Sequence, residues 1–359
     1  MSTLPEPTLP IIAAPMAGGA STPALVAAVS EAGGLGYLAA GYRRADAMSE
    51  QIARTRELTD RPFGVNLFVP AATDPAALAG VPAYRAELLP EAERRGVALP
   101  ERIAPDDEDW NAKIAALLAD PVPVVSYTFG LPTRQEADAL RAAGTAQVAT
   151  VTSVAEARAA VALGVDALCV QGPEAGGHRG THQAGPEPGG EPLLELLALV
   201  RAAVDLPLIA AGGLGDGAAI AAALRAGARA VQLGTAYLLA EEAGTSAPHR
   251  AALADPAFTE TVGTRAFTGR VARGLRNAFI DEHAGHAPHA YPEVHHLTAP
   301  LRAAATARAD TQQMHLWAGT AFAKARPGTA GEITARLWHE AQRQDTPWRT
   351  GTAQEREPR

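Results

Sequence analysis

The chain has 359 residues, of which 47% are hydrophobic and 19% charged, and this is enough apolar residue for a large core. Its net charge is −8 and no cluster of lysine and arginine stands out, so nucleic-acid binding is disfavoured, because neutralising phosphates needs a basic face. No apolar run reaches membrane-spanning length, and residues 1–6 lack the basic and apolar regions of a signal peptide, so we expect a soluble cytoplasmic protein.

Short apolar runs alternate with amphipathic, alanine-rich segments through most of the chain. Eight runs lack strict alternation, as expected of strands covered on both faces: residues 9–14, 35–39, 63–69, 122–129, 146–151, 165–170, 206–211 and 229–233. Helical patterns lie between them, at residues 23–32, 134–143, 154–163, 191–203 and 216–226, and several end in an Ala-Gly pair typical of a helix C-terminus. These repeats predict an α/β fold, the TIM (β/α)8 barrel, with a doubly wound open sheet as the alternative.

Two regions do not follow this alternation of strands and helices. Residues 70–121 are rich in Pro, Ala and acidic residues and suggest an enlarged connection after the third strand, with a helix near residues 110–118. Residues from about 245 onward show amphipathic helices without convincing strands. We therefore predict a barrel domain over residues 1–244, a helical subdomain packed on the barrel mouth over residues 245–345, and a disordered tail over residues 346–359.

Small and polar residues follow the first, third and sixth strands, at the edge where a parallel barrel builds its active site. Ala14 ends the first strand, Met16 lies in the turn after it, Asn66 lies on the third strand, and Gln171 ends the sixth. Asn and Gln carry both a donor and an acceptor, which suits the edge of a flavin or a similar heterocycle. The alternative for Asn66 is a polar group satisfied inside the barrel.

The sixth strand leads into a glycine-rich loop, from Gln171 to Gly180, that contains His178 and Arg179. Glycines on either side let a flat ligand approach the backbone closely. Histidine is the side chain whose ordinary pKa lies nearest neutrality, so His178 is a candidate general base. The alternative is a flexible surface loop with an incidental histidine.

Glycine turns follow the seventh and eighth strands, where TIM barrels commonly bind phosphate. Gly212 and Gly213 follow the seventh strand, and residues 232–235 close the eighth, with Thr235 adding a hydroxyl. Both turns place bare backbone N–H groups at the start of a following helix, an arrangement that binds a phosphate dianion. Glycines also close tight connections, but two such turns at these positions favour phosphate binding.

Together these segments resemble the nitronate monooxygenase family, also called 2-nitropropane dioxygenase-like proteins, over about residues 9–280. Residues 10–19, 64–68, 171–180, 210–213 and 231–235 carry the resemblance. It implies an FMN-binding TIM barrel with an added helical domain, in which His178 is the catalytic base. The residues expected to contact FMN are Ala14, Met16, Asn66, Gln171, Gly176, Gly212, Gly213, Gln232, Leu233, Gly234 and Thr235.

The resemblance implies a flavoprotein oxidoreductase, a monooxygenase that converts alkyl nitronates, and nitroalkanes, with O2 to carbonyl compounds and nitrite. His178 would remove the α-proton of a neutral nitroalkane, and its protonated form or Arg179 would stabilise the anionic nitronate. One alternative is an FMN-dependent NAD(P)H:quinone or enoyl-thioester reductase, because flavin-barrel enoyl reductases share the Glu-Ala-Gly-Gly-His core. The other is a non-catalytic FMN-binding accessory protein. The expected partners are a small nitro compound and O2, with no nucleic acid and no membrane, and the sequence leaves a homodimer open.

Five histidines crowd a short later segment: His283, His286, His289, His295 and His296. Their spacing suggests metal ligands, but Pro288 and Pro292 interrupt any helix, and no His-Glu-x-x-His pattern is present. We therefore predict a solvated, histidine-rich loop and no functional metal.

Overall fold

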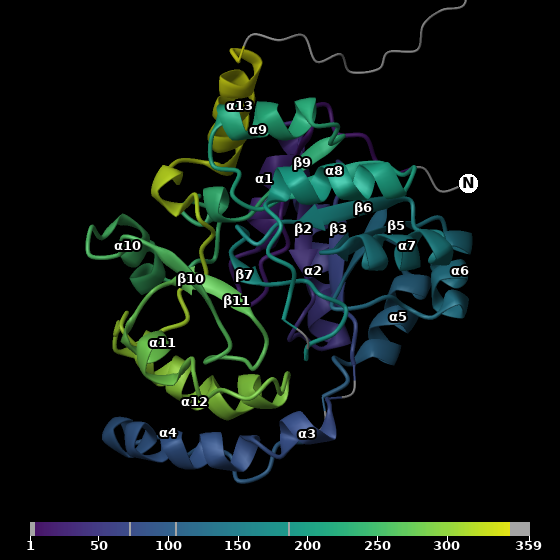
Figure 1. Cartoon of the computed structure of the whole chain (residues 1–359). Coiled ribbons are helices and arrows are strands. Elements are labelled where there is room, and N and C mark those ends of the chain that lie inside the picture. The colour runs from purple at the N-terminus through teal and green to yellow at the C-terminus, as the bar shows by residue number, and fades with distance from the viewer. Residues whose placement is uncertain (1–3, 72, 105, 186, 345–359) are drawn as a thin grey trace, which may run out of the picture.

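Eight parallel strands close into a barrel in the computed structural model, which describes residues 4–71, 73–104, 106–185 and 187–344 (Figure 1). Strand β9 pairs with β1, so that Gln232 lies opposite Ile12. The strands, in spatial order, are β1 (Ile11–Ala13), β2 (Leu35–Ala39), β3 (Gly64–Phe68), β4 (Val124–Thr128), β5 (Ala146–Val151), β6 (Ala167–Gln171), β8 (Leu208–Ala211) and β9 (Ala230–Leu233). This closure confirms the TIM barrel and excludes the open sheet. The tail expected to be disordered lies outside the described residues.

A ring of helices surrounds the barrel, one for each strand: α1 (Pro23–Glu31), α2 (Ala45–Leu58), α5 (Trp110–Ala119), α6 (Arg134–Ala142), α7 (Val154–Leu163), α8 (Leu193–Ala203), α9 (Gly217–Arg225) and α13 (Ala330–Gln342). Local sequence sets their ends. The Thr22 hydroxyl accepts a hydrogen bond from the Leu25 amide at the start of α1. Gly33, Gly144 and Gly227, which follow α1, α6 and α9, have φ angles of 92°, 90° and 101°, a left-handed conformation that ends a helix. Within the described residues, no helix is long and apolar enough to cross a membrane.

The eighth helix of the ring comes from the far end of the chain. Helix α13 packs against α9 and α1 and so fills the place between the last and the first βα units (Figure 1). An added region lies between β9 and α13 and comprises η1 (Thr235–Tyr237), α10 (Ala247–Ala254), β10 (Thr261–Thr264), β11 (Ala272–Leu275), α11 (Ala278–His283), α12 (Glu293–Ala307) and η2 (Phe322–Lys324). The sequence indicated only helices there, because β10 and β11 are four residues long and contain no apolar run. The boundary at residue 244 stays a prediction, although barrel packing continues beyond it through α13.

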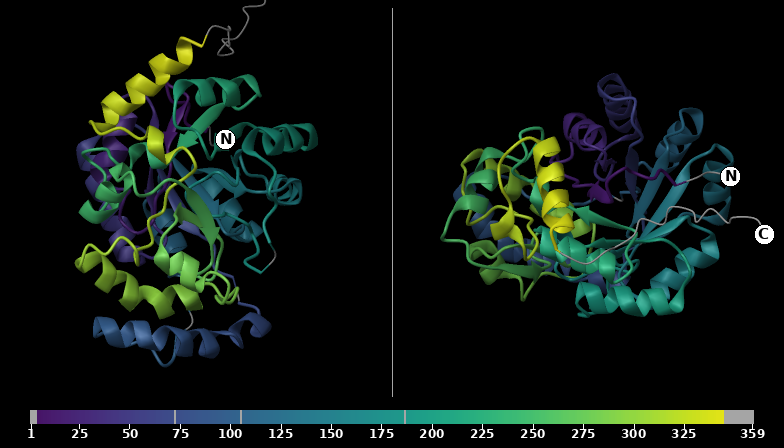
Figure 2. Two further views of the ribbon diagram at one scale, coloured as in Figure 1. Left: turned by 60° about the vertical axis from the view of Figure 1, so that its left-hand side comes forward. Right: turned by 90° about the horizontal axis from the view of Figure 1, so that it is seen from above.

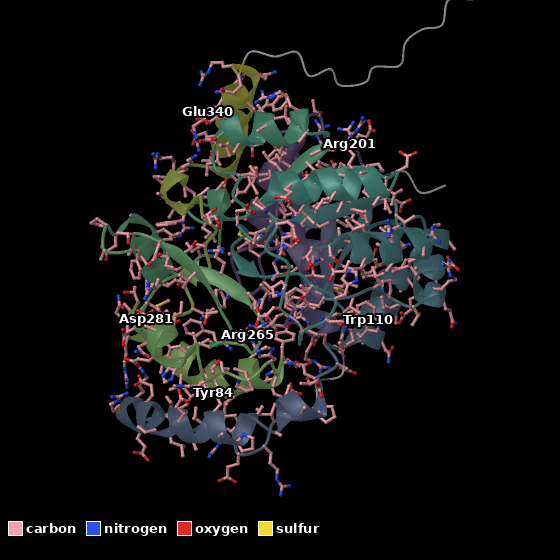
Figure 3. All side chains as sticks on the ribbon, in the orientation of Figure 1. Tyr84, Trp110, Arg201, Arg265, Asp281 and Glu340 are labelled. Atoms are coloured by element: carbon pink, nitrogen blue, oxygen red, sulfur yellow. The ribbon has the colours of Figure 1, made fainter. Side chains whose placement is uncertain are left out.

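The enlarged connection after β3 joins the added region. Helices α3 (Pro75–Leu78) and α4 (Val81–Arg95) lie outside the ring, and α4 packs along α12 (Figures 1 and 2). Tyr84 of α4 is buried there, and its hydroxyl donates to the carbonyl of Ala266 at 2.7 Å (Figure 3). Because apolar side chains of both segments share one core, they pack as one unit.

A small antiparallel sheet holds the glycine-rich loop after β6. Strand β7 (Gly177–His178) pairs with β11, so that His178 lies opposite Ala272 and Gly177 opposite Arg273. Strand β11 in turn pairs with β10. The flexible-loop alternative for residues 171–180 is therefore wrong, because an element of the added region fixes this loop.

Candidate active site

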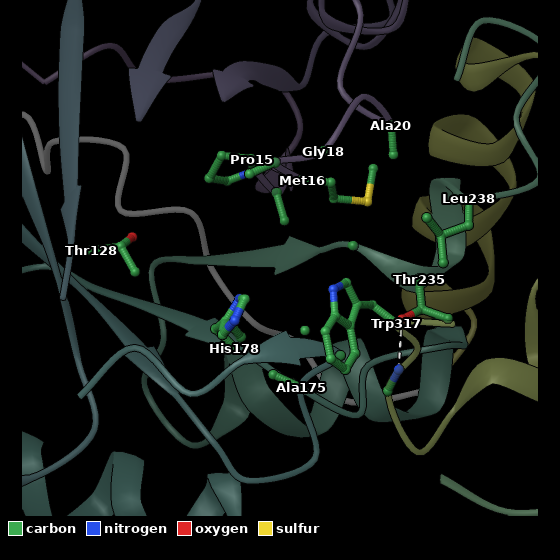
Figure 4. Close-up of a pocket in the computed structure, with 18 of the residues that line it drawn as sticks. Pro15, Met16, Gly18, Ala20, Thr128, Ala175, His178, Thr235, Leu238 and Trp317 are labelled. Atoms are coloured by element: carbon green, nitrogen blue, oxygen red, sulfur yellow. Dashed lines mark hydrogen bonds between the residues drawn. The ribbon is translucent and has the colours of Figure 1, made fainter. Parts of the chain in front are cut away.

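A cavity of about 350 Å³ lies between the carboxyl ends of the barrel strands and the added region (Figure 4). It is lined by His178 and by every residue expected to contact FMN: Ala14, Met16, Asn66, Gln171, Gly176, Gly212, Gly213, Gln232, Leu233, Gly234 and Thr235. The barrel thus brings the expected site residues together from distant parts of the sequence. Their contacts with a cofactor stay a prediction.

The turn after β1 presents main chain to the cavity. The Met16 amide donates to the Ser21 hydroxyl at 2.9 Å, and this hydroxyl donates to the carbonyl of Ala14 at 3.3 Å. A Cβ placed on Gly234 would stand 3.6 Å from Cβ of Ala14 and 3.8 Å from the Met16 sulfur. The turns after β1 and β9 therefore meet in one wall, which Ser21 holds in shape.

Two glycine turns offer main-chain donors to the cavity. Gly212 and Gly213 have φ angles of 116° and 69°, in the region that favours glycine. The amides of Gly212, Gly213 and Gly234 have no acceptor among the described residues, and all three residues line the cavity. The Thr235 hydroxyl accepts a hydrogen bond from the Gly319 amide at 2.9 Å, so it also ties residues 316–320 to this wall (Figure 4). An array of free amides is suited to a phosphate dianion.

Asn66 is buried on β3 with its orientation set by three oxygens. Its amide nitrogen lies 3.2 Å from the carbonyl of Ser126, 2.9 Å from the Ser126 hydroxyl and 3.0 Å from the Thr128 hydroxyl. These three acceptors identify which terminal atom of the Asn66 carboxamide is the nitrogen, namely the one that faces β4. The carboxamide oxygen has no partner in the described chain and remains an acceptor on the cavity wall.

Gln171 clamps the loop that follows it. Its amide nitrogen donates to the carbonyl of His178 at 3.0 Å, and its carboxamide oxygen accepts from the Gly180 amide at 2.7 Å. A second N–H remains for a ligand, because the amide carries two donors. Gln171 therefore positions His178 in addition to lining the cavity.

Arg179 does not line the cavity, and its expected part in stabilising a nitronate is wrong. Its guanidinium donates to the main-chain carbonyls of Gln171 and Gly189 instead. Successive side chains of an extended segment point to opposite sides. The backbone that turns His178 toward the cavity therefore turns Arg179 away from it.

His178 projects from β7 into the cavity (Figure 4). Its ring lies among those of Phe129, Tyr291 and Trp317, with centroid distances of 5.7, 5.7 and 5.6 Å. Its Nε2 lies 2.9 Å from the hydroxyl of Thr268. The imidazole is thus held by one hydrogen bond in an aromatic surrounding.

Burial and two arginines keep this imidazole neutral. Burial lowers the pKa of His178 to about 3, and the charges of Arg270 and Arg302 act in the same direction. Arg270 lies over the Phe129 ring, 4.1 Å from its centroid, outside the cavity wall. Arg302 extends from α12 into the wall itself. At pH 7 the His178 side chain is therefore in the form that accepts a proton.

The added region supplies cavity residues that the sequence did not assign to the site: His249, Thr268, His295, Arg302, His315 and Trp317. Of these, only His295 was noted in the sequence, as a member of the histidine-rich segment. No local motif marks the others. Their approach to His178 depends on how α10, α12 and the sheet β10-β11-β7 pack on the barrel mouth.

Only the middle of the histidine-rich segment is the solvated loop that was expected. His286 and His289 lie in the loop between α11 and α12, and His286 is exposed, whereas His283 ends α11, and His295 and His296 lie on α12. His283 lies 2.6 Å from a carboxylate oxygen of Glu87, whereas the ring of His295 stacks on Tyr42 with centroids 4.1 Å apart. In the part of the chain that the structure describes, no group of three or more His, Cys, Asp or Glu side chains is arranged to hold a metal.

Comparison with known proteins gives consistent matches over almost the whole chain. A sequence profile described as Nitronate monooxygenase matches residues 4–340. A probable nitronate monooxygenase of Staphylococcus aureus (strain Newman) is 39% identical over 319 residues, which cover 86% of this chain and 88% of the relative. The structure is similar to that of nitroalkane oxidase from Streptomyces ansochromogenes, with a TM-score of 0.90, 50% identity and coverage of 94% and 96% of the two chains. It is also similar to FabK from Thermotoga maritima, with a TM-score of 0.73, 26% identity and coverage of 94% of each chain.

Proposed function

Because the chain belongs to the nitronate monooxygenase family, we propose that it is an FMN-dependent oxidoreductase that converts alkyl nitronates, and the nitroalkanes that form them, with O2 to carbonyl compounds and nitrite. The observation that carries the proposal is the single cavity lined both by the neutral imidazole of His178 and by the free amides of the two glycine turns. A base and a phosphate-binding cradle on one cavity suit a flavin enzyme that acts on a carbon acid.

The cavity wall fits FMN in its donors and acceptors. The free amides of Gly212, Gly213 and Gly234 would hold the phosphate, and the free carboxamide oxygen of Asn66 would accept from a ring N–H. The main chain from Ala14 onward would face the ring. The chemistry that bound FMN would supply is the transfer of electrons from the nitronate to O2.

His178 acts before that redox step when the substrate is a neutral nitroalkane. Removing the α-proton yields the nitronate, and neutral His178 accepts this proton. The Thr268 hydroxyl lies 3.2 Å from the carbonyl of Arg270, to which it donates. Its oxygen then accepts the Nε2–H of His178, and Nδ1 is left as the basic nitrogen. A pre-formed nitronate does not need this base.

The surroundings of His178 would also keep water from the reacting centre. The rings of Phe129, Tyr291 and Trp317 enclose the imidazole, and Phe129 is 2% exposed. An apolar enclosure strengthens the electrostatic interactions within it and protects reactive intermediates from hydrolysis.

Anaerobic mixing of the purified protein with propyl-2-nitronate tests the proposal. The visible flavin absorbance is expected to bleach with the nitronate and to be unaffected by NADH or NADPH, and readmitted air is expected to restore the colour as nitrite appears. Rapid bleaching by NADH or NADPH would identify a reductase instead. A protein that stays colourless after addition of FMN would contradict the cofactor.

A further inference from the structure

Arg302 is the only charged side chain, among the described residues, that lines the cavity. It is 8% exposed. The rest of the wall consists of glycines, apolar side chains, hydroxyls, carboxamides, Cys169 and four histidines, and burial lowers the pKa of each of these histidines. At neutral pH the wall therefore carries one positive charge and no negative charge.

No carboxylate among the described residues neutralises Arg302. Its Nε donates to the Thr298 hydroxyl at 3.0 Å, and one Nη donates to the carbonyl of His295 at 2.7 Å and lies 3.3 Å from Nδ1 of the same residue. These acceptors are neutral, and the other Nη has no partner within the described chain. Burial lowers the pKa of Arg302 to about 10, a shift opposed by Tyr42 and Tyr291, so the guanidinium stays protonated at neutral pH. A buried charge without a counter-ion is unfavourable, and an anionic ligand would compensate it.

His315 also lines the cavity. Its Nδ1 is buried and has no hydrogen-bond partner among the described residues, so this nitrogen does not itself face the cavity. The charge of Arg302 lowers the pKa of both His315 and His178, so the three side chains lie within electrostatic reach of one another. Arg302 thus lies on the same side of the cavity as His178, whereas the free amides belong to the turns after β8 and β9.

We propose that the unpartnered Nη of Arg302 binds the anionic oxygens of the nitronate and makes the site selective for the anion. This inference rests on the proposed function. The unpartnered Nη carries two N–H groups, and these would donate to the oxygens of the O–N–O group of a nitronate. When a neutral nitroalkane is the substrate, its proton moves from the α-carbon to His178 and the negative charge develops beside Arg302. That interaction offsets the unfavourable protonation of His178 between two arginines.

Steady-state turnover by Arg302→Met tests the assignment, because methionine keeps an apolar stem and removes the charge. With propyl-2-nitronate, the variant is expected to raise KM roughly ten- to a hundredfold. With 2-nitropropane, KM is expected to change little, because the bound nitroalkane is neutral, and kcat is expected to fall. Nitrate, a planar oxyanion, is expected to compete with the nitronate on the wild-type protein and to lose this effect in the variant.

Arg250→Met is the matched control. The guanidinium of Arg250 likewise has only neutral acceptors, the main-chain carbonyls of Thr245, Ala240 and Ala243, but Arg250 does not line the cavity. It is expected to retain nitrate competition and a near wild-type KM for the nitronate. If both variants lose nitrate competition alike, or if Arg302→Met leaves the nitronate KM unchanged, the assignment is overturned.

Two further measurements keep the inference testable. Should Arg302→Met fail to fold, Arg302→Lys replaces it. Lysine keeps the positive charge but loses the N–H groups of the guanidinium, so nitrate inhibition is expected to weaken about five- to tenfold. Unchanged nitrate inhibition in Arg302→Lys would refute the assignment. A wild-type protein that does not oxidise nitronates would refute the proposed function instead. In that case calorimetric titration of nitrate into wild-type and variant protein still tests Arg302, since loss of binding in the variant supports the anion site and equal binding contradicts it.

Discussion

The surroundings of His178 determine its protonation. An isolated imidazole would be partly charged near neutrality, but burial and the neighbouring arginines lower its pKa to about 3. This keeps the base in its proton-accepting form over the whole physiological range. It also makes the imidazolium unstable, so a proton moves to His178 only if a negative charge develops nearby. The proposed base and the proposed anion site are therefore one electrostatic unit.

Substitution of the base should separate the two kinds of substrate. His178→Asn is expected to lower turnover of neutral nitroalkanes roughly a hundredfold or more, because a general base contributes about that much. Turnover of pre-formed nitronates is expected to fall far less, since they have already lost the proton. Steady-state rates with 2-nitropropane and propyl-2-nitronate provide the measurement. Equal losses on both substrates, with FMN still bound, would show that His178 is not the base.

Thr268 should act through His178 rather than on the substrate. Its hydroxyl is buried and lies 2.9 Å from Nε2 of the imidazole. Thr268→Val removes the acceptor for Nε2–H at nearly constant volume and is expected to lower kcat on 2-nitropropane roughly tenfold. Thr268→Ser is expected to restore most of the rate. A melting temperature equal to that of the wild type would separate this positioning role from a loss of stability, and failure of serine to rescue would argue against it.

Short elements of the added region hold the loop that carries the base. Strand β7 has only two residues, yet pairing with β11 and the clamp from Gln171 fix the main chain on both sides of the imidazole. Gly176 packs against the segment that carries Trp317: a Cβ there would stand 2.6 Å from the amide nitrogen of Gly319. Gly176 is therefore required for a close approach of two backbones, beyond any contact with FMN.

Gly176→Ala should therefore push apart the loop and residues 316–320. Overpacking against a main chain typically destabilises a protein by about 1–3 kcal/mol, so we expect a lower melting temperature, a lower flavin content and slower turnover. Gly185→Ala is the matched control, because a Cβ at Gly185 meets nothing within 4 Å. Thermal melting and the flavin-to-protein absorbance ratio check the prediction. If both variants behave like the wild type, the close approach at Gly176 is not important for the site.

Across the whole molecule, the barrel and the added region enclose neutral histidines between them. Burial lowers the pKa of His178 to about 3 and that of His249 to about 4, and it lowers the pKa of His295 and His315 as well. In the unfolded chain these groups titrate near about 6.5. Below that pH the unfolded state binds more protons than the native state, so stability falls as pH falls from about 6.5 toward 4.

The holoprotein is therefore expected to lose thermal stability steadily on acidification, by up to about 1.4 kcal/mol per buried histidine for each pH unit. Melting temperatures measured between pH 7.5 and 4.5 test this. His249→Gln removes one titrating group and is expected to make the dependence shallower. A melting temperature that stays constant down to pH 5, or an unchanged slope in the variant, would contradict the linkage.

The barrel could be predicted from the sequence because its signals are local. Each barrel strand is a short run of three to six residues, as at β5 (Ala146–Val151), and the glycines after α1, α6 and α9 end their helices in a left-handed conformation that few other residues adopt. The loop that carries His178 and the glycine turns could also be recognised, because glycine beside a polar group is distinctive in an alanine-rich chain. These features depend only on residues that are neighbours in the sequence, so they can be predicted without the tertiary structure.

The sequence by itself thus determined the closed barrel, the cavity residues at its strand ends and the candidate base. Only the tertiary structure decided that α13 completes the ring, that Arg179 turns away from the cavity, and that Arg302 and His315 enter it. The physical reason is distance along the chain. The orientation of Arg179 depends on pairing between β7 and β11, and the position of Arg302 depends on the packing of α12 over the barrel mouth. Neither the β7–β11 pairing nor the packing of α12 has a local sequence pattern, yet both determine which charges surround His178.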